Sequence, residues 1–383
     1  MKIGQFAIAF PSTLEPIEVY GSERITYVLC NELSKKNHQI KIFVPYKKEF
    51  TEENGNIKIF FYKSIVKLQI YYISLKLLYL PSHEDLDIIH IHNDSPMAII
   101  AGFFCSKQKD IPLVITWHGD YNGTTLLKTI IAFFLNKIVL KVILSSVNTI
   151  IAPSEKYVDC SNILPGYRKK IVEISHGLNF DDVLNTPSKD ECRLKYNIDR
   201  NRLIVLYVSS LTEHKGADRL LEAIPEIVSK YPETQFIFVG GGNLKKYNEI
   251  AKLEKISDNV IFTGYVTEQE KYIYFKSADI FVFPSMNSHE VFPVVTLESA
   301  GFGLPIVVGK LKIFENRIID GYNGLYFNSE NPDSLSKVII HLLENEELRL
   351  KLGTNARNVV FQKYTADKMA EETINVYNKL IKK

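Results

Sequence analysis

The sequence predicts an α/β protein built from two doubly wound, Rossmann-like domains that face each other across a cleft. Short apolar runs rich in Ile, Val and Phe recur along the chain, and segments of helical length separate them. Near-continuous apolar strands that alternate with helices indicate parallel sheets covered on both faces. The alternation pauses once, at residues 179–202, and a length of 383 residues fits two domains better than one.

The apolar runs give the expected strands in order. Before the pause they lie at residues 2–8, 40–44, 87–91, 113–116, 148–152 and 171–175. After it they lie at residues 203–209, 235–239, 260–263, 280–284, 306–308 and 324–327. The intervening segment is polar and holds no long apolar run, which is typical of a linker with a short helix. We therefore expect domains at residues 1–182 and 183–365, and a C-terminal helix at 366–383 that packs back on the N-terminal domain.

The composition excludes several classes of protein. Lys and Arg number 46 against 44 Asp and Glu, so the net charge of +2 gives no general attraction to nucleic acid. The four cysteines lie far apart without a Cys-x-x-Cys pair, which argues against a disulfide framework or a zinc ribbon and favours a reducing cytoplasm. No run reaches the roughly 20 apolar residues of a membrane-spanning helix.

The most informative segment leaves a strand, crosses a polar loop and enters a short helix. Pro293 suits the first helical turn, where its missing N–H costs nothing. The free N–H groups of Val294 and Val295 then suit a phosphate. Glu298, one turn further into the helix, could accept hydrogen bonds from ribose hydroxyls. Glu290 could accept hydrogen bonds from sugar hydroxyls or stabilise positive charge at an anomeric carbon. A helix cap and a solvated glutamate explain the pattern equally well.

A second strand, loop and helix place Lys215 just before a helix, where its ammonium suits a diphosphate. A solvated loop lysine is the competing interpretation. Three glycines at residues 240–242 also follow a strand, but Lys245 stands where a dinucleotide fingerprint needs its last glycine. A nicotinamide dehydrogenase is therefore disfavoured, although the glycines still allow a nucleotide to approach the backbone.

In the first domain, His118 directly follows a buried strand, so its imidazole suits a sugar hydroxyl or, equally, a local carbonyl. Gly21, between the first strand and its helix, would let substrate touch the backbone, although turn geometry alone also explains it.

Two pairs resemble metal ligands. Asp85 and Asp87 form an Asp-x-Asp pattern, and His90 and His92 share one face of a strand. No third ligand at a characteristic spacing accompanies either pair, so we expect no metal site.

Two apolar runs with lysines or tyrosines, at residues 63–80 and 126–143, suit the surface of a bilayer. Helices buried against a sheet explain them about as well. We expect a cytoplasmic protein whose membrane contact, if it has any, is peripheral and on the inner face of the membrane.

These segments together resemble the glycosyltransferases of family 4, retaining enzymes with the GT-B fold. The strongest part is the Glu-x7-Glu pair, Glu290 and Glu298, within Phe-Pro-Ser…Glu-x-Phe-Pro…Leu-Glu-Ser-Ala. Residues 116–119, 215–216, 264–266 and 320–324 match further motifs in the family's order. The resemblance covers essentially the whole chain.

The resemblance implies transfer of a hexose-type sugar from a nucleotide-sugar donor to a hydroxyl of a glycan or lipid-linked acceptor, without a metal or other cofactor. It assigns catalytic roles to Glu290 and His118, both near the sugar. It assigns donor binding to Lys215, Ser210, Gly21, Tyr265, Val266, Phe292, Val294, Val295 and Glu298. Within that set, Lys215 and the helix N-terminus would bind the diphosphate. Glu298 would bind the ribose, and the backbone around Tyr265 would bind the base.

The chain departs from the family pattern in three places. Ser210 stands where the family usually has the arginine of Gly-Arg-Leu, and a serine cannot replace that charge. A glycine pair is reduced to Tyr20-Gly21, and the usual Asn-Gly reads His176-Gly177. A sugar-nucleotide epimerase of the same architecture and a catalytically impaired, nucleotide-sugar-binding partner subunit therefore stay open as alternatives. A glycosidase is less favoured, because the sequence does not fix the carboxylate separation that hydrolysis needs.

Overall fold

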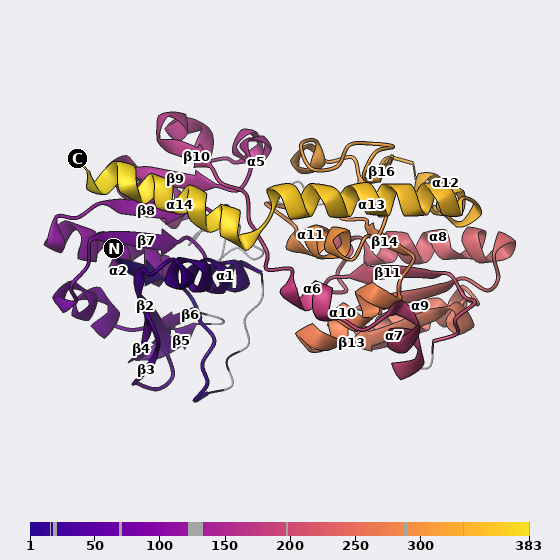
Figure 1. Cartoon of the computed structure of the whole chain (residues 1–383), viewed down its shortest axis with the longest axis horizontal. Coiled ribbons are helices and arrows are strands. Elements are labelled where there is room, and N and C mark those ends of the chain that lie inside the picture. The colour runs from indigo at the N-terminus through magenta and orange to yellow at the C-terminus, as the bar shows by residue number, and fades with distance from the viewer. Residues whose placement is uncertain are drawn as a thin grey trace. The chain divides into compact units, whose positions relative to one another are not determined.

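The computed structural model describes residues 1–15, 17, 21–68, 71–121, 133–196, 198–286, 290–331 and 333–382 (Figure 1). The chain forms two compact units. The N-terminal unit comprises residues 1–178 and 365–383, and the C-terminal unit comprises residues 179–364. The expected divisions, after residues 182 and 365, lie beside the observed ones.

The N-terminal unit is built on an eight-stranded sheet in the order β10-β9-β8-β7-β1-β2-β4-β3. Its strands are β1 (Lys2–Phe6), β2 (Gln39–Tyr46), β3 (Phe50–Asn54), β4 (Ile57–Lys63), β7 (Ile88–His92), β8 (Leu113–Thr116), β9 (Thr149–Ala152) and β10 (Ile171–Glu173). All neighbours are parallel except β3, which pairs antiparallel with β4 at the edge. The central strands are buried along their length, as expected for a sheet covered by helices.

Helices cover this sheet. They are α1 (Ser22–Lys35), α2 (Pro96–Lys109), α4 (Leu140–Ser146), α5 (Glu155–Cys160) and α14 (Ala366–Ile381). The Ser95 side chain caps α2, and Pro96 occupies its first turn, where no N–H is needed. The last helix, α14, lies beside α1 (Figure 1) and buries Met369 and Tyr377.

Residues 63–80, one of the two apolar runs, do not form a long helix. The described part contains a small antiparallel hairpin of β5 (Val66–Leu68) and β6 (Tyr71–Ile73), followed by short 3₁₀ turns. The helical interpretation of this run is wrong, because its β-branched and aromatic residues favour a strand pair.

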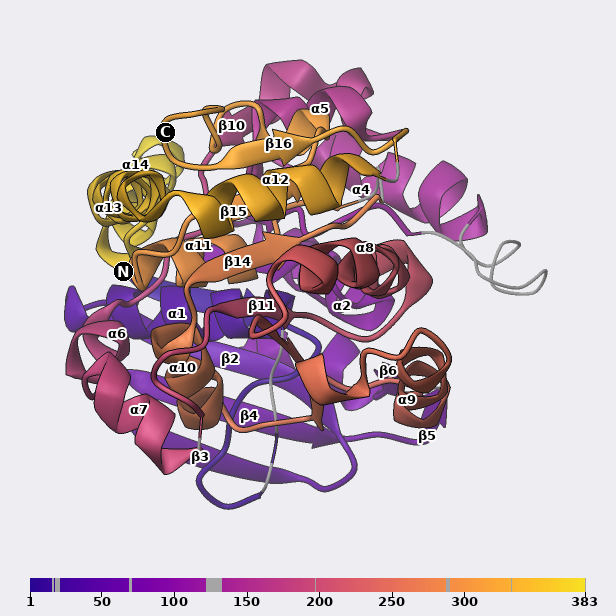
Figure 2. The same cartoon turned by 90° about the vertical axis from the view of Figure 1, so that its right-hand side faces the viewer.

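The C-terminal unit has a six-stranded, fully parallel sheet in the order β13-β12-β11-β14-β15-β16. Its strands are β11 (Ile204–Val208), β12 (Gln235–Val239), β13 (Val260–Gly264), β14 (Ile280–Phe283), β15 (Ile306–Gly309) and β16 (Leu325–Phe327). Its helices are α6 (Asp181–Asn185), α7 (Lys189–Lys195), α8 (Ala217–Lys230), α9 (Leu244–Leu253), α10 (Glu268–Ser277), α11 (Val294–Gly301), α12 (Asp333–Glu344) and α13 (Glu346–Lys363). Helices α8 and α12 contact each other on one face of the sheet (Figure 2).

Each sheet contains a topological switch point. In the N-terminal unit β1 pairs with both β2 and β7, and in the C-terminal unit β11 pairs with both β12 and β14. Chain connections leave such a strand pair in opposite directions, so ligands in doubly wound folds bind beyond the carboxyl ends of the strands at this point.

None of the helices that the structure describes combines the length and the apolar character needed to cross a bilayer.

Candidate active site

Two loops meet at the switch point of the C-terminal unit. One follows β11 and contains a 3₁₀ turn at Glu213–Lys215, and the other follows β14 and leads to α11. Gly216 ends the first loop with a φ of 79°, and a Cβ at that position would lie 2.1 Å from the carbonyl oxygen of Pro284 in the second. Only glycine combines that backbone conformation with so close an approach, so Gly216 fixes the distance between the two loops.

Lys215 and Glu290, both predicted site residues, are brought together by these loops. The Lys215 Nζ lies 2.5 Å from Glu290 Oε1, although the two residues are 75 positions apart in the sequence. Glu290 is only 8% exposed. Ser285 Oγ also donates to Glu290 Oε1 at 3.1 Å, which orients the carboxylate. The interpretation of Glu290 as a solvated loop glutamate is therefore wrong.

Helix α11 begins at Val294, so Pro293 is its N-cap residue and lies just before the first turn, not within it as the sequence predicted. The Thr296 N–H is already bonded to the Pro293 carbonyl. Within the described part of the chain, the N–H groups of Val294 and Val295 have no acceptor, and both residues are partly exposed. The helix therefore presents two free amide donors and the positive end of its dipole next to the Lys215–Glu290 pair.

Glu298 is buried in α11, and its partner was not predicted from the sequence. Lys271 of α10 reaches it with an Nζ–Oε1 distance of 2.9 Å and also binds Glu268 at 2.8 Å. The Lys271 side chain is 13% exposed and that of Glu298 is 4% exposed. Glu298 thus carries a compensated negative charge and is not a solvated helix residue.

Arg317 is a further charged residue that sequence reasoning missed. It is buried, and its guanidinium lies over the Phe292 ring at 4.0 Å from the ring centre. Its Nε and Nη1 atoms have no hydrogen-bond partner among the residues that the structure describes. Burial lowers the pKa of Arg317 to about 10, while the negative charge of nearby Glu290 acts in the opposite direction.

The remaining predicted donor residues of this unit line the same strand ends. Ser210 is exposed after β11, and its carbonyl accepts from the buried Tyr207 hydroxyl at 2.8 Å. Tyr265, after β13, is 79% exposed, and Val266 beside it is partly exposed. A Cβ at Gly241 would lie 2.0 Å from the Tyr265 ring. The glycine run therefore makes room for this ring, a function that sequence reasoning did not foresee.

His118 follows β8 at the carboxyl edge of the N-terminal sheet. Its backbone N–H donates to Asn93 Oδ1 at 2.5 Å, and Asn93 Nδ2 donates to the Gly119 carbonyl at 2.9 Å. Asn93 comes directly after β7, so it ties the His118 loop to the neighbouring strand. The Nε2 atom of His118 lies 2.9 Å from Nδ1 of His92, so the partner of this ring nitrogen is a side chain rather than a local carbonyl.

Gly21 lies immediately before α1 with a φ of 55°, a conformation that glycine adopts most readily. A Cβ there would meet nothing within 4 Å, so the backbone at this strand end is accessible. The neighbouring Tyr20 lies outside the described residues.

The two metal-like pairs have other partners. Asp85 forms an ion pair with the Lys2 side chain, and Asp87 accepts from the Lys2 N–H at 2.7 Å, so both stabilise the start of β1. His90 and His92 stack with their ring centres 4.7 Å apart inside the unit. Across the residues that the structure describes, no three His, Cys, Asp or Glu side chains cluster as metal ligands.

The second apolar run, residues 126–143, lies partly outside the described residues, Lys128 included. Its described part exposes four large apolar side chains, namely Phe133, Phe134, Ile138 and Val142. Leu140, Ile143 and Leu144 are buried beneath them. This segment therefore has one buried and one exposed apolar face.

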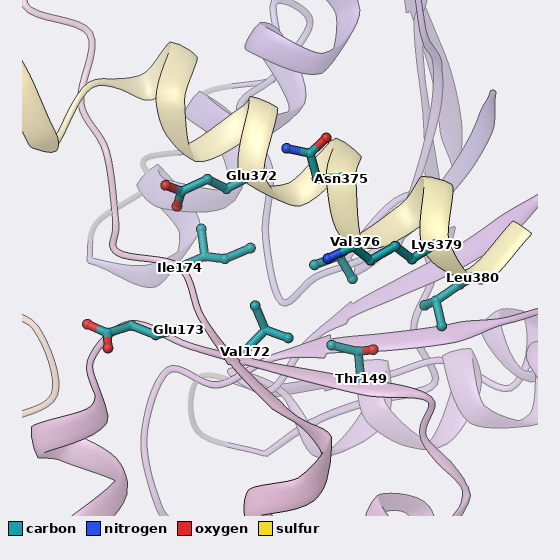
Figure 3. Close-up of a pocket in the computed structure, with 9 residues that line it drawn as sticks. All are labelled: Thr149, Val172, Glu173, Ile174, Glu372, Asn375, Val376, Lys379 and Leu380. Atoms are coloured by element: carbon teal, nitrogen blue, oxygen red, sulfur yellow. The ribbon is translucent and has the colours of Figure 1, made fainter.

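A cavity of about 210 Å³ in the N-terminal unit lies between α14 and the edge strand β10 (Figure 3). Val172 and Ile174 face Val376 and Leu380 across it. None of the predicted site residues lines this cavity, so it is separate from the candidate site.

Comparisons with known proteins place the chain in a family. Residues 19–182 match the model of Glycosyltransferase Family 4, and residues 188–359 match that of Glycosyl transferases group 1. O-antigen chain mannosyltransferase C of Escherichia coli is 27% identical over 376 residues, which span 96% of this chain and 97% of that protein. Alpha-monoglucosyldiacylglycerol synthase of Acholeplasma laidlawii is 26% identical over 313 residues, or 78% of this chain and 76% of that protein.

Solved structures share the whole fold. Sucrose-phosphate synthase from Thermosynechococcus elongatus superposes with a TM-score of 0.80 and 17% identity, over 100% of this chain and 99% of that one. HepE of Anabaena in complex with UDP-glucose gives a TM-score of 0.75 and 16% identity, over 99% and 100% of the two chains.

The fold and the matches together define a glycosyltransferase with the GT-B fold. The chain belongs to family 4 of these enzymes, as the motifs of its sequence indicated.

Proposed function

We propose that this enzyme transfers a hexose-type sugar, with retention of anomeric configuration and without a metal ion, from a nucleotide-sugar donor to a hydroxyl of a cell-surface glycan or glycolipid. One observation carries the proposal. Lys215, Glu290 and the free amides of α11 converge at the carboxyl ends of β11 and β14, where a doubly wound fold binds its ligand.

The diphosphate of the donor needs its negative charge neutralised as it leaves. An ammonium group has three donors, so Lys215 can keep its contact with Glu290 and still bind a phosphate oxygen. The amides of Val294 and Val295 supply two further donors. In this arrangement the protein provides the charge stabilisation that a divalent cation provides in other transferases.

Glu290 is suited to the sugar end of the donor. Its carboxylate is held by Lys215 and Ser285, so it can accept from sugar hydroxyls or stabilise positive charge that develops at the anomeric carbon. Glu298, beyond the first turn of α11, is suited to the ribose hydroxyls. The exposed Tyr265 ring and the Val266 backbone offer a surface for the base.

By the family resemblance, His118 is assigned to the transferred sugar and the Gly21 backbone to the donor. During transfer, the acceptor oxygen bonds to the anomeric carbon while the bond from that carbon to the diphosphate oxygen breaks. The acceptor proton passes to the departing diphosphate.

Names of similar proteins guide the choice of substrates. HepE was solved with UDP-glucose, and the two relatives above are named for an O-antigen chain and for a glycolipid. We therefore propose a UDP-sugar as the first donor to test and a glycan or glycolipid as the acceptor. The exposed Phe133, Phe134, Ile138 and Val142 support peripheral contact with a lipid surface.

A thermal-shift screen of UDP, GDP and ADP sugars in EDTA tests donor binding and metal independence together. A ligand at a hundred times its dissociation constant adds about 2.7 kcal/mol to the free energy of unfolding. Turnover is then measured with acceptor glycans and glycolipids presented on vesicles. Binding without turnover against any acceptor would favour a nucleotide-sugar-binding partner subunit, and an epimerised free sugar nucleotide would favour an epimerase.

The Glu290→Ala variant tests the site itself. We expect turnover to fall at least about 100-fold, because a preorganised charge at the reacting centre is lost. The matched control is Glu213→Ala, which removes an exposed carboxylate from the neighbouring loop. Full turnover in Glu290→Ala, or an equal loss in both variants, would contradict the assignment.

A further inference from the structure

A chain of buried polar side chains runs from His118 into the interior of the N-terminal unit. His118 Nε2 lies 2.9 Å from His92 Nδ1, and His92 Nε2 lies 3.0 Å from Gln5 Oε1. The Gln5 Nε2 group donates to the Tyr377 hydroxyl at 3.4 Å. His92, Gln5 and Tyr377 are fully buried. The chain thus links His118, through β7 and β1, to α14.

The chain continues beyond Tyr377. The Tyr377 hydroxyl lies 2.5 Å from His90 Nδ1, and His90 Nε2 lies 2.7 Å from Thr116 Oγ1. Because Gln5 Nε2 donates to the Tyr377 oxygen, the Tyr377 hydroxyl proton is left for His90 Nδ1, and His90 then donates from Nε2 to Thr116. The Gln5 amide therefore has its nitrogen toward Tyr377 and its carbonyl oxygen toward His92 Nε2.

This orientation determines where the protons sit on both histidines. A carbonyl oxygen can only accept, so His92 must carry its proton on Nε2. A neutral imidazole has one N–H, which leaves His92 Nδ1 as an acceptor for a proton on His118 Nε2. His118 Nδ1 is therefore an unprotonated acceptor. It has no hydrogen-bond partner among the side chains and backbone groups that the structure describes.

Both histidines are held neutral by their surroundings. Burial lowers the pKa of His118 to about 3 and that of His92 well below its usual value, with the neighbouring His90, His118 and His176 lowering the His92 pKa as well. The His118 ring lies between those of His92 and His176, at centre distances of 5.2 and 5.5 Å. A second proton on either ring would place a charge inside this cluster.

We propose that Gln5 acts through His92 as a positioning residue that fixes the tautomer of His118, so that His118 accepts a hydrogen bond from a hydroxyl of the transferred sugar and cannot donate one. This inference rests on the proposed contact between His118 and the sugar. The transferred sugar must then carry a hydroxyl at the carbon that His118 contacts. A fluorine, or an oxygen without a proton, has nothing to donate to His118.

Nitrogen NMR tests the tautomer without any substrate. Long-range proton–nitrogen spectra of the full chain labelled with ¹⁵N-histidine distinguish protonated from unprotonated ring nitrogens, and a His118→Asn variant assigns the His118 signals. We expect His118 and His92 both protonated at Nε2. Protonation of His118 at Nδ1 would overturn the proposal, whatever the enzyme transfers.

Variants then test the role of Gln5. In Gln5→Met the amide oxygen is lost while the volume is kept, so we expect the two histidines to populate both tautomers. In Tyr377→Phe, which removes the hydroxyl that orients the Gln5 amide, we expect a smaller change in the same direction. The exposed His341 serves as an internal reference that neither variant should shift. Unchanged His118 tautomers in both variants would also overturn the proposal.

Kinetics with altered donors provide the second readout. For the active donor sugar, replacing the contacted hydroxyl by hydrogen or by fluorine should lower kcat/KM equally, by about tenfold. In Gln5→Met the fluorinated donor should recover relative to the deoxygenated one, because His118 can then donate. A wild-type enzyme that accepts every fluorinated donor better than its deoxygenated counterpart would contradict the acceptor role. Lack of turnover with all donors would instead refute the proposed function while leaving the NMR result intact.

Discussion

The buried Lys271–Glu298 pair gives a sharp test of the electrostatics beneath the candidate site, because Lys271 binds two glutamates in very different surroundings. Glu298 is 4% exposed, whereas Glu268, also bonded to Lys271, is 47% exposed. The same substitution, Glu→Gln, can therefore be made at each of the two glutamates that bind Lys271. Removing one partner of a buried pair costs about 3–5 kcal/mol, whereas an exposed pair contributes at most about 1 kcal/mol.

We expect Glu298→Gln to lower the free energy of unfolding by about 3 kcal/mol, at the low end of that range because Lys271 retains Glu268. Glu268→Gln should cost less than about 1 kcal/mol. For a unit of this size the two melting temperatures should fall by about 6–12 °C and by less than about 4 °C. Circular dichroism during thermal and urea unfolding measures both. Equal destabilisation in the two variants would refute the reasoning from burial.

Three further predictions concern other parts of the chain. Gly216→Ala should cost at least about 3 kcal/mol, since its φ is positive and a Cβ would clash with a facing carbonyl. Gly55→Ala, with a similar φ and open space, should cost about 1 kcal/mol in the same urea titration, and equal costs would contradict the clash. Burial lowers the pKa of His90 to about 3 and that of His92 well below its usual value. The unfolded state therefore binds protons that the folded state excludes, and the free energy of unfolding should fall as the pH drops below 6.5. The fall should approach about 1.4 kcal/mol per pH unit for each histidine, and flat stability between pH 7 and pH 5 would contradict it. Arg317→Met should leave the free energy of unfolding unchanged or raise it, since it removes a buried, incompletely bonded cation, and a loss above about 2 kcal/mol would show that the charge is structurally required.

Sequence periodicity was enough to locate the core of both sheets. The runs at 113–116 and 235–239 coincide with β8 and β12, because strands buried on both faces are continuously apolar. The hairpin of β3 and β4 was missed for the opposite reason. β3 (Phe50–Asn54) is an edge strand with mostly exposed polar residues, and its antiparallel pairing needs no crossover helix to signal it.

The residues of the candidate site that lie at strand ends could be predicted from the sequence. The residues that reach them through long-range contacts could not. Lys215 and Glu290 were identified by their positions after buried strands, and the parallel topology brings those positions together. Lys271 was not identified, since it contacts Glu298 from a helix whose register the sequence alone does not fix, and Asn93 was overlooked although it directly follows a buried strand. Their side chains have no distinctive spacing relative to the motifs.

The two units are completed in an unusual order during synthesis of the chain. The C-terminal unit is continuous, whereas the N-terminal unit is completed only by α14, which is synthesised after the whole C-terminal unit. Until then α1 lacks its neighbour, and Gln5 and His90 lack the Tyr377 hydroxyl. A nascent chain therefore holds a fully formed second unit while its first unit still exposes apolar surface. Loss of the final helix would leave the N-terminal unit, rather than the unit that carries Lys215 and Glu290, dependent on chaperones.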